Sequence, residues 1–261
     1  MIADKRRNVL SFFGLVLILS LPFYALGATS ASLPFVPALP ISALGASVPM
    51  IAAVVLVGRQ AGTAVAIGLF ASTFSVRTIL NPWWALVALA IMPLSFGVTG
   101  ALVWLSGAAI PTLHLLPASA IIPAFALFFL GAVGEEVGWQ GYAFPALAGP
   151  QSALKAALII GVFWALWHVV PFALMGRSAT WIVWQGLGMV LMRIIIVWLF
   201  INAGQSILIA VMFHMMSNSV WGLFPDFDPY YSPMVMCLVL LAPVTAILLI
   251  CGPATLTRVK S

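Results

Sequence analysis

Charged side chains are scarce in this sequence: 6% of its 261 residues are Asp, Glu, Lys or Arg, whereas 64% are hydrophobic. About a quarter of the residues in a soluble domain are charged, so this chain has too few to cover a surface that faces water. Continuous apolar stretches of about 20 residues, the length that a membrane-spanning helix requires, follow one another along the chain. They lack the alternation of a transmembrane β-barrel. We therefore predict an all-α, polytopic transmembrane helix bundle in which residues 1–261 form a single integral membrane domain.

Several motifs are also missing, and each absence disfavours a class of protein. The sequence has no HExxH motif of ordinary zinc proteases, no serine in a GxSxG elbow, and no internal repeat of the kind that marks many transporters. Cys237 and Cys251 are its only cysteines, and their apolar run contains no histidine to activate a thiol. On one helix the two would lie about 21 Å apart, too far for a disulfide, so we interpret both as small core residues.

The chain is basic, with a net charge of +5. A basic chain can bind nucleic acid, but here Lys and Arg do not cluster on a surface helix. They stand where membrane topology would place them. We therefore expect the lipid bilayer as a partner, and no nucleic acid.

Loops rich in Pro and Gly divide the chain into about eight predicted spans. They cover residues 9–28, 41–58, 83–106, 118–143, 152–172, 181–202, 205–222 and 233–252. The first run follows three basic residues and resembles a cleaved signal peptide, but its length and the later spans favour an uncleaved helix. Residues 60–78 are apolar but rich in Gly, Ser and Thr, and predict either an interfacial helix or an extra span.

The distribution of charge favours the interfacial helix. With eight spans and a cytoplasmic N-terminus, one side of the membrane holds eight basic residues: Lys5, Arg6, Arg7, Arg59, Arg77, Lys155, Arg258 and Lys260. The opposite side holds Arg177 together with Asp226 and Asp228. By the positive-inside rule, both termini are therefore predicted to be cytoplasmic.

Two carboxylates lie inside the fourth predicted span. Glu135 and Glu136 are the only glutamates in the chain, and apolar residues continue the run after them. An ionisable group within a span is costly, so it indicates a functional site. Adjacent residues point about 100° apart around a helix. We therefore expect one carboxylate to face the site and the other to find a separate partner.

Two of the three histidines are also placed within spans, His168 in the fifth and His214 in the seventh. Either one alone would be typical of a core residue bonded to a neighbouring carbonyl, but together with two glutamates they indicate a site. Asn218 follows His214 by four residues and shares its helix face. The third histidine, His114, lies in a Pro-bounded loop without such a context.

The depths of these residues agree with a shared site. Counted from the predicted cytoplasmic ends, Glu135 lies roughly 12 Å deep, His214 about 15 Å and His168 about 20 Å. A carboxylate and an imidazole can deprotonate a water, while a second imidazole and an amide can stabilise an oxyanion. The same Glu and His atoms could instead hold a divalent metal such as zinc. Either assembly would hydrolyse an amide, so the metal requirement stays open.

Three short motifs in order resemble the CPBP family of CAAX proteases and bacteriocin-processing (Abi) proteins. The EExxxR motif corresponds to Glu135–Gln140, the FxxxH motif to Trp164–His168, and the HxxxN/D motif to His214–Asn218. Their helical context agrees, and the resemblance covers residues 118–224. It implies an intramembrane endopeptidase in which the motif glutamate and His168 activate water while His214 and Asn218 stabilise the oxyanion. The implied catalytic residues are Glu135, Glu136, His168, His214 and Asn218. The implied substrate is a peptide or protein, in some members lipidated, and the implied location is a bacterial cell membrane.

The sequence departs from the first motif at its last position, where Gln140 replaces Arg. Gln140 can hydrogen-bond Glu136 but cannot neutralise it, so a degenerate, non-catalytic member of the family stays an alternative. Arg193 is the one basic residue well inside a span. We hypothesise that it replaces the absent Arg as counter-ion of Glu136. The competing interpretation is that Arg193 snorkels to the cytoplasmic headgroups.

Two other functions remain open at this stage. A transporter or proton relay would also place Glu and His within the membrane. A bacteriocin-immunity or partner-binding protein could keep the fold without catalysis.

Overall fold

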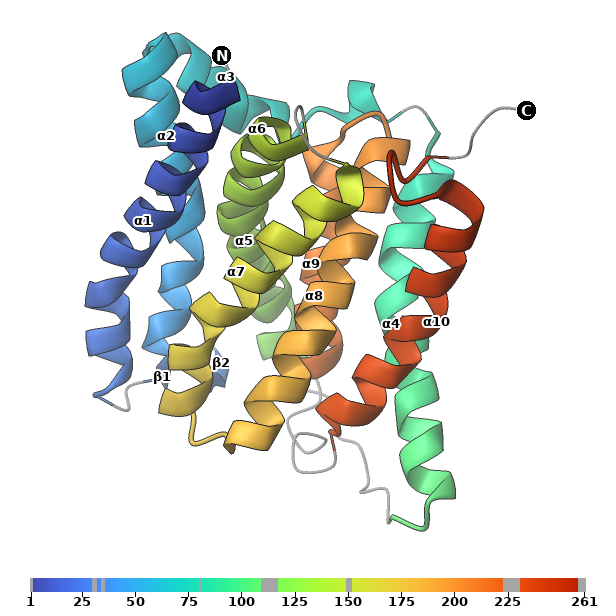
Figure 1. The fold of residues 1–261 in the computed structure, drawn as a ribbon. Helices are drawn as coiled ribbons and strands as arrows, with labels where there is room; N and C mark the ends of the chain where they lie inside the picture. The colour runs from blue at the N-terminus through green and yellow to red at the C-terminus, as the bar shows by residue number, and fades with distance from the viewer. Residues whose placement is uncertain are drawn as a thin grey trace.

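The computed structural model describes residues 2–29, 32–33, 36–79, 81–108, 117–148, 152–222 and 231–257. The helices are α1 (Ile2–Gly27), α2 (Val48–Ala61), α3 (Thr63–Ser72), α4 (Trp83–Leu105), α5 (Ala118–Gly138), α6 (Phe144–Ala148), α7 (Ala153–Leu174), α8 (Ala179–Asn202), α9 (Ile207–Gly222) and α10 (Pro233–Cys251). They form one bundle (Figure 1), which confirms the predicted fold class.

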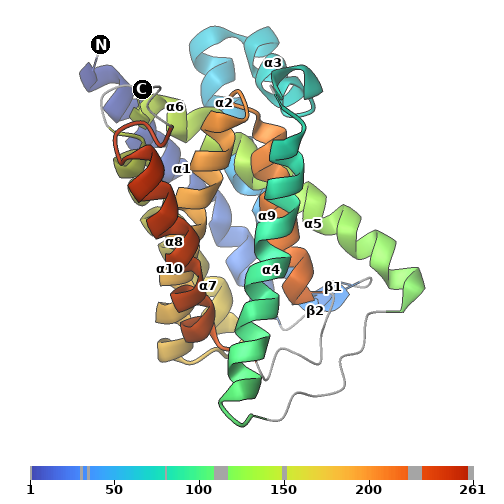
Figure 2. The ribbon, with the colours of Figure 1, turned by 90° about the vertical axis from the view of Figure 1, so that its right-hand side faces the viewer.

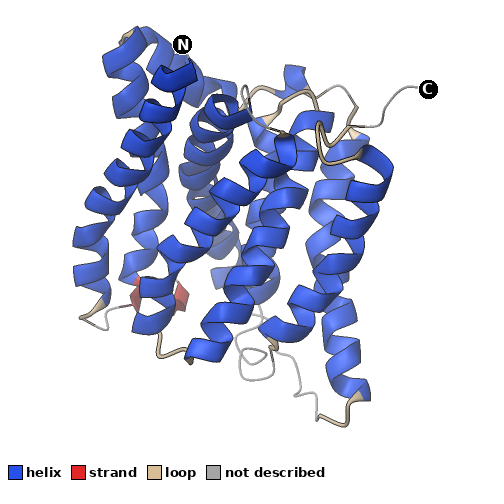
Figure 3. Cartoon of the chain, viewed as in Figure 1, coloured by secondary structure: helices blue, strands red, loops and turns tan. Residues whose placement is uncertain are grey.

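Short elements join these helices. Two 3₁₀ turns, η1 (Ile41–Ser47) and η2 (Val76–Thr78), precede α2 and α4, and a π-helical turn, η3 (Trp139–Ala143), joins α5 to α6. The segment that follows α1 was predicted as a loop. It contains a small antiparallel hairpin of β1 (Ser32–Leu33) and β2 (Val36–Pro40), drawn in red in Figure 3.

Within the described residues, seven helices are long and apolar enough to cross a membrane. They are Asn8–Gly27, Ile41–Ala61, Trp83–Leu105, Ser119–Ala148, Ala153–Leu174, Ala179–Asn202 and Pro233–Cys251. Each overlaps a predicted span, so the chain is an integral, multi-pass membrane protein. The remaining predicted span is α9, whose 16 residues extend only about 24 Å.

The short helix α9 still carries the chain from one end of the bundle to the other. Along the chain it follows α8 and precedes α10, and it runs antiparallel to both, so α1 begins and α10 ends at the same end (Figure 1). A backbone hydrogen bond of 2.7 Å from Ala153 at the start of α7 to Ala254 ties the chain together at that end. Helix α3 lies there too and has only 10 residues, too few for the extra span considered from sequence.

One end of the bundle is basic. Arg59 lies in the last turn of α2, Arg77 in η2 and Lys155 in the first turn of α7, all at the end where α1 begins. Arg177 lies between α7 and α8 at the opposite end. We call the first the basic end. His114, Asp226, Asp228, Arg258 and Lys260 lie outside the described residues.

The basic end is expected to face the cytoplasm. Reporter domains fused at Arg59, at Lys155 and at the C-terminus should give a cytoplasmic signal, because basic loops are retained on that side. A reporter near Asp226 should give the opposite signal. A cytoplasmic signal at Asp226 would contradict the eight-pass arrangement.

Helix α5 packs closely against the backbone of η1 and the start of α2 because it has glycines at the points of contact. A Cβ on Gly138 would lie 2.6 Å from backbone atoms of Pro49, and one on Gly134 would lie 2.6 Å from the carbonyl oxygen of Ala46. Small residues at such contacts are typical of packed membrane helices. The first half of α5 leans away from α4 (Figure 2), whereas residues 132–140 are buried throughout. The glutamates are in this enclosed half.

Candidate active site

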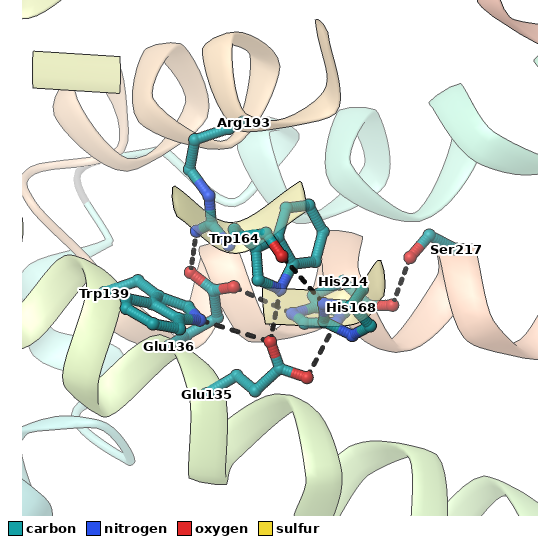
Figure 4. Close-up of polar contacts among 8 residues, drawn as sticks. All are labelled: Glu135, Glu136, Trp139, Trp164, His168, Arg193, His214 and Ser217. Carbon is teal, nitrogen blue, oxygen red and sulfur yellow. Dashed lines mark hydrogen bonds and ion pairs between the residues drawn. The ribbon is translucent and has the colours of Figure 1, made fainter. Parts of the chain in front are cut away.

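Glu135 sits among indole donors at the end of α5. Its Oε2 accepts hydrogen bonds from Nε1 of Trp139 at 3.1 Å and from Nε1 of Trp164 at 2.5 Å (Figure 4). Trp139 is on the next turn of the same segment, and Trp164 comes from α7. Both donors act on one oxygen, so Oε1 is left facing the histidines. The two indoles therefore fix the direction in which this carboxylate points.

The side chain of Glu136 leaves α5 in a different direction from that of Glu135, as expected for adjacent residues on a helix. Its Oε2 lies 2.7 Å from Nη1 of Arg193, and its Oε1 lies 2.8 Å from Nδ1 of His214. Both Glu136 and Arg193 are fully buried. The snorkelling interpretation of Arg193 is therefore wrong, because its guanidinium stays in the bundle beside a carboxylate.

The guanidinium of Arg193 has a second neighbour. Its Cζ lies 4.4 Å from the centroid of the Trp164 ring, a cation–π distance. Helix α8 can come this close to α7 because Gly161 has no side chain; a Cβ there would lie 3.1 Å from Cβ of Arg193. Trp164 thus contacts Arg193 with its ring face and Glu135 with its N–H.

Hydrogen bonds fix the tautomer of both histidines. Nδ1 of His168 lies 2.9 Å from the carbonyl oxygen of Trp164. A carbonyl only accepts, so Nδ1 carries the hydrogen and Nε2 of the neutral ring has a free lone pair. Nδ1 of His214 likewise donates to the Glu136 carboxylate. Nε2 of His214 then lies 3.9 Å from Oε1 of Glu135.

Four of the five predicted site residues line one cavity. Glu135, His168, His214 and Asn218 all border a hollow of about 230 Å³, whose remaining wall is mostly aromatic and aliphatic. Glu136 does not border it and lies behind His214. The cavity therefore brings together one carboxylate, two imidazoles and an amide from three helices.

Gln140 does not take the place of the missing motif Arg. It is fully buried, and neither atom of its amide has a hydrogen-bond partner in the described part of the chain. It therefore does not make the bond to Glu136 that the sequence allowed. The positive charge comes instead from α8, through Arg193.

Sequence reasoning missed the role of the tryptophans. Trp164 was identified as the aromatic residue of the second motif, and neither Trp139 nor Trp164 was predicted to contact Glu135. Their spacing held a signal, because Trp139 follows Glu135 by four residues and Trp164 precedes His168 by four. Trp167 was also missed as a link: its Nε1 donates to Oγ of Ser20 at 2.7 Å, which joins α7 to α1.

The donor set does not fit a metal site as it stands. Among the described residues, no group of three or more His, Cys, Asp and Glu side chains is arranged to hold a metal ion. Oε2 of Glu135 already accepts from two indoles, and Glu136 is paired with Arg193. Among the described residues, this geometry therefore gives no support to the zinc alternative.

The fold and the cluster define a class of protein: a multi-pass helical membrane protein in which Glu and His side chains border a cavity and a buried Glu–Arg pair lies behind them. Residues 117–220 match the family described as type II CAAX prenyl endopeptidase Rce1-like. The predicted resemblance to the CPBP and CAAX protease family is therefore confirmed on this segment, which contains all three motifs.

A curated CAAX protease is also similar to part of this chain. The chain is 37% identical over 106 residues to CAAX prenyl protease 2 of Methanococcus maripaludis. The match covers 37% of this chain, and the chain spans about two fifths (39%) of the length of that relative.

Proposed function

We propose that this protein is an intramembrane endopeptidase that hydrolyses a peptide bond with a water held between Glu135 and His168. The observation that carries the proposal is the shared cavity of Glu135, His168, His214 and Asn218, within a segment that matches a protease family. The name of the archaeal relative supports the same reaction.

Glu135 is the proposed general base. Its Oε1 accepts a proton from the water while Nε2 of His168 accepts the second hydrogen bond and orients it. The water oxygen then forms a bond to the carbonyl carbon of the substrate. When this tetrahedral intermediate collapses, the C–N bond breaks and the amine leaves with the proton that Glu135 received.

His214 and Asn218 are the proposed donors to the oxyanion. His214 in its protonated form donates through Nδ1 to Glu136 and through Nε2 to the developing oxygen. The amide of Asn218, one turn further along the same face of α9, supplies a second N–H. Glu136 and Arg193 then act as positioning residues, because they hold the His214 ring without reaching the cavity.

The proposed substrate is a membrane-associated peptide or protein, with a lipidated segment as the favoured form. The cavity wall beyond the polar cluster is mostly apolar and includes Phe128, Met189 and Leu240, which suits an apolar chain. The location we propose is a bacterial cell membrane, as the family resemblance implies.

Two other functions have less support. A non-catalytic immunity protein would not need the oriented Nε2 atoms of two histidines. A proton relay would need groups that exchange protons, and Glu136 is instead held in an ion pair with Arg193.

The test is hydrolysis of a quenched, farnesylated CAAX-type peptide by the purified protein in liposomes. Cleavage after the farnesylated Cys is expected, and its response to a chelator would show whether a metal takes part. Absence of cleavage of both farnesylated and unmodified membrane peptides would overturn the proposal.

Asn218→Ala should lower kcat by about 10²–10³-fold, the usual loss for one oxyanion donor, with a smaller change in KM. Asn81→Ala is the matched control, because Asn81 is exposed at the start of α4. Equal rates for the two variants would contradict the role assigned to Asn218.

A further inference from the structure

Helix α1 lies outside the segment that matches the protease family, residues 117–220, yet it forms part of the cavity wall. Ser20, Phe23 and Tyr24 of α1 border the same hollow as His168. Ser20 and Tyr24 are four residues apart and therefore share one face of the helix. Polar side chains within a span are costly unless they have partners, so the partners of this pair show what it does.

Tyr24 compensates for a proline in α7. Pro171 lies inside that helix and has no N–H, so the carbonyl of Trp167, four residues earlier, lacks the donor that a regular helix would give it. The hydroxyl of Tyr24 donates to this carbonyl oxygen at 2.7 Å. Unpaired backbone groups are costly inside a bilayer. Helix α1 therefore supplies a hydrogen bond that α7 cannot make for itself.

Ser20 holds the side chain of the same tryptophan. Nε1 of Trp167 donates to Oγ of Ser20 at 2.7 Å, and the hydroxyl of Ser20 donates to the carbonyl oxygen of Val16 at 2.7 Å. These roles are fixed, because an indole N–H only donates and a carbonyl only accepts. Ser20 is fully buried. Trp167 is thus held at its backbone by Tyr24 and at its ring by Ser20.

Trp167 passes this constraint to the neighbouring His168. The two rings meet edge to face, with centroids 4.9 Å apart and planes at 88°. Nδ1 of His168 donates to the carbonyl oxygen of Trp164 at 2.9 Å, so a carbonyl and an indole both restrict the imidazole. Pro171 follows His168 by three residues, and helices kink at proline. The direction of Nε2 of His168 therefore depends on how firmly α1 holds α7 at this point.

We infer that Ser20 and Tyr24 are positioning residues, which hold His168 through Trp167 in the orientation that the reacting water requires. A helix outside the family-matching segment is thereby part of the support of the active site. This inference rests on the proposed function for the role of His168, but the orientation of the ring can be measured without turnover.

Tyr24→Phe removes one hydroxyl and keeps the ring. It should lower kcat by about 10–100-fold and change KM by less than about twofold, since a small displacement of a catalytic group costs up to about 10²-fold in rate. Ser20→Ala should act in the same direction. Tyr142→Phe is the matched control, because its ring packs on Phe12 of α1 but does not border the cavity. Wild-type kcat in both Tyr24→Phe and Ser20→Ala would overturn the inference.

A second substitution tests the role of the Trp167 carbonyl. Pro171→Ala restores the N–H that pairs with this carbonyl inside α7. In that background, Tyr24→Phe should change kcat by no more than about twofold, because the two groups act on one acceptor and their effects are not additive. An equal loss of kcat in both backgrounds would show that the Tyr24 hydroxyl acts elsewhere, and would overturn its assignment.

NMR of isotope-labelled histidine separates this inference from the proposed function. In detergent micelles the wild type should give one set of His168 ring signals, assigned with His168→Ala, with the proton on Nδ1. Tyr24→Phe should broaden or split these signals, and Tyr142→Phe should not. Such a change without hydrolysis by the wild type would keep the hold on His168 and remove the protease. Hydrolysis by the wild type with unchanged His168 signals in Tyr24→Phe would leave the protease and remove the positioning role.

Discussion

Glu135→Gln is expected to lower kcat by at least about 10³-fold while the protein stays folded, because it removes the general base. The amide oxygen of Gln can still accept from the indoles of Trp139 and Trp164, which now donate to Oε2. The amide nitrogen then takes the place of Oε1 and cannot accept a proton. The measurement is single-turnover hydrolysis, together with the thermal unfolding midpoint.

Two further variants make this result specific. Glu135→Asp keeps a carboxylate but shortens its reach, so it should retain part of the rate. His168→Ala should also abolish hydrolysis, because it removes the second group that holds the water. Full activity in Glu135→Gln or His168→Ala would favour the non-enzymatic function.

Arg193→Leu is expected to destabilise the protein by about 3–5 kcal/mol, the usual cost when one partner of a buried ion pair is removed. Glu136 would then remain fully buried with only His214 beside it. Its carboxylate would no longer hold the His214 ring in one orientation, so residual folded protein should also lose activity. Denaturation in a mild detergent and kcat of the folded fraction measure the two effects.

Rescue distinguishes charge from packing. Adding Gln140→Arg to Arg193→Leu puts a guanidinium one turn after Glu136 and should restore part of the stability and rate. Adding Glu136→Gln should restore stability but not the rate, since it removes the unpaired charge without orienting His214 as before. Arg59→Leu, at an exposed position on α2, should change stability by no more than about 0.5 kcal/mol. If Gln140→Arg restores nothing, Arg193 does not substitute for the motif Arg.

The pairing of Arg193 with Glu136 suggests how the chain compensates for its departure from the motif. The charge that EExxxR supplies from the same helix is supplied here from α8, at the same depth. Gln140 is enclosed without a hydrogen-bond partner among the described residues, so it fills space in the π-helical turn. A motif search along one helix cannot find this counter-ion, because Arg193 lies 57 positions after Glu136 in the sequence.

The sequence by itself determined that this protein lies in a lipid bilayer, and it located most of the helices. An apolar run long enough to span a bilayer must pair its backbone groups internally, and a helix does so within one segment. Length and hydropathy therefore located α1, α4, α7, α8 and α10 without tertiary information. The same logic singled out Glu135, Glu136, His168 and His214, because each is costly in an apolar run unless a site holds it.

Only the tertiary structure decided which of these groups meet and which way they face. The rotation of a helix about its axis depends on contacts with its neighbours, such as Gly138 against Pro49 and Gly161 against Arg193. These contacts turn Glu135 toward the cavity and Glu136 toward Arg193. No periodicity along a single segment encodes these features, since each depends on how separate helices pack against one another.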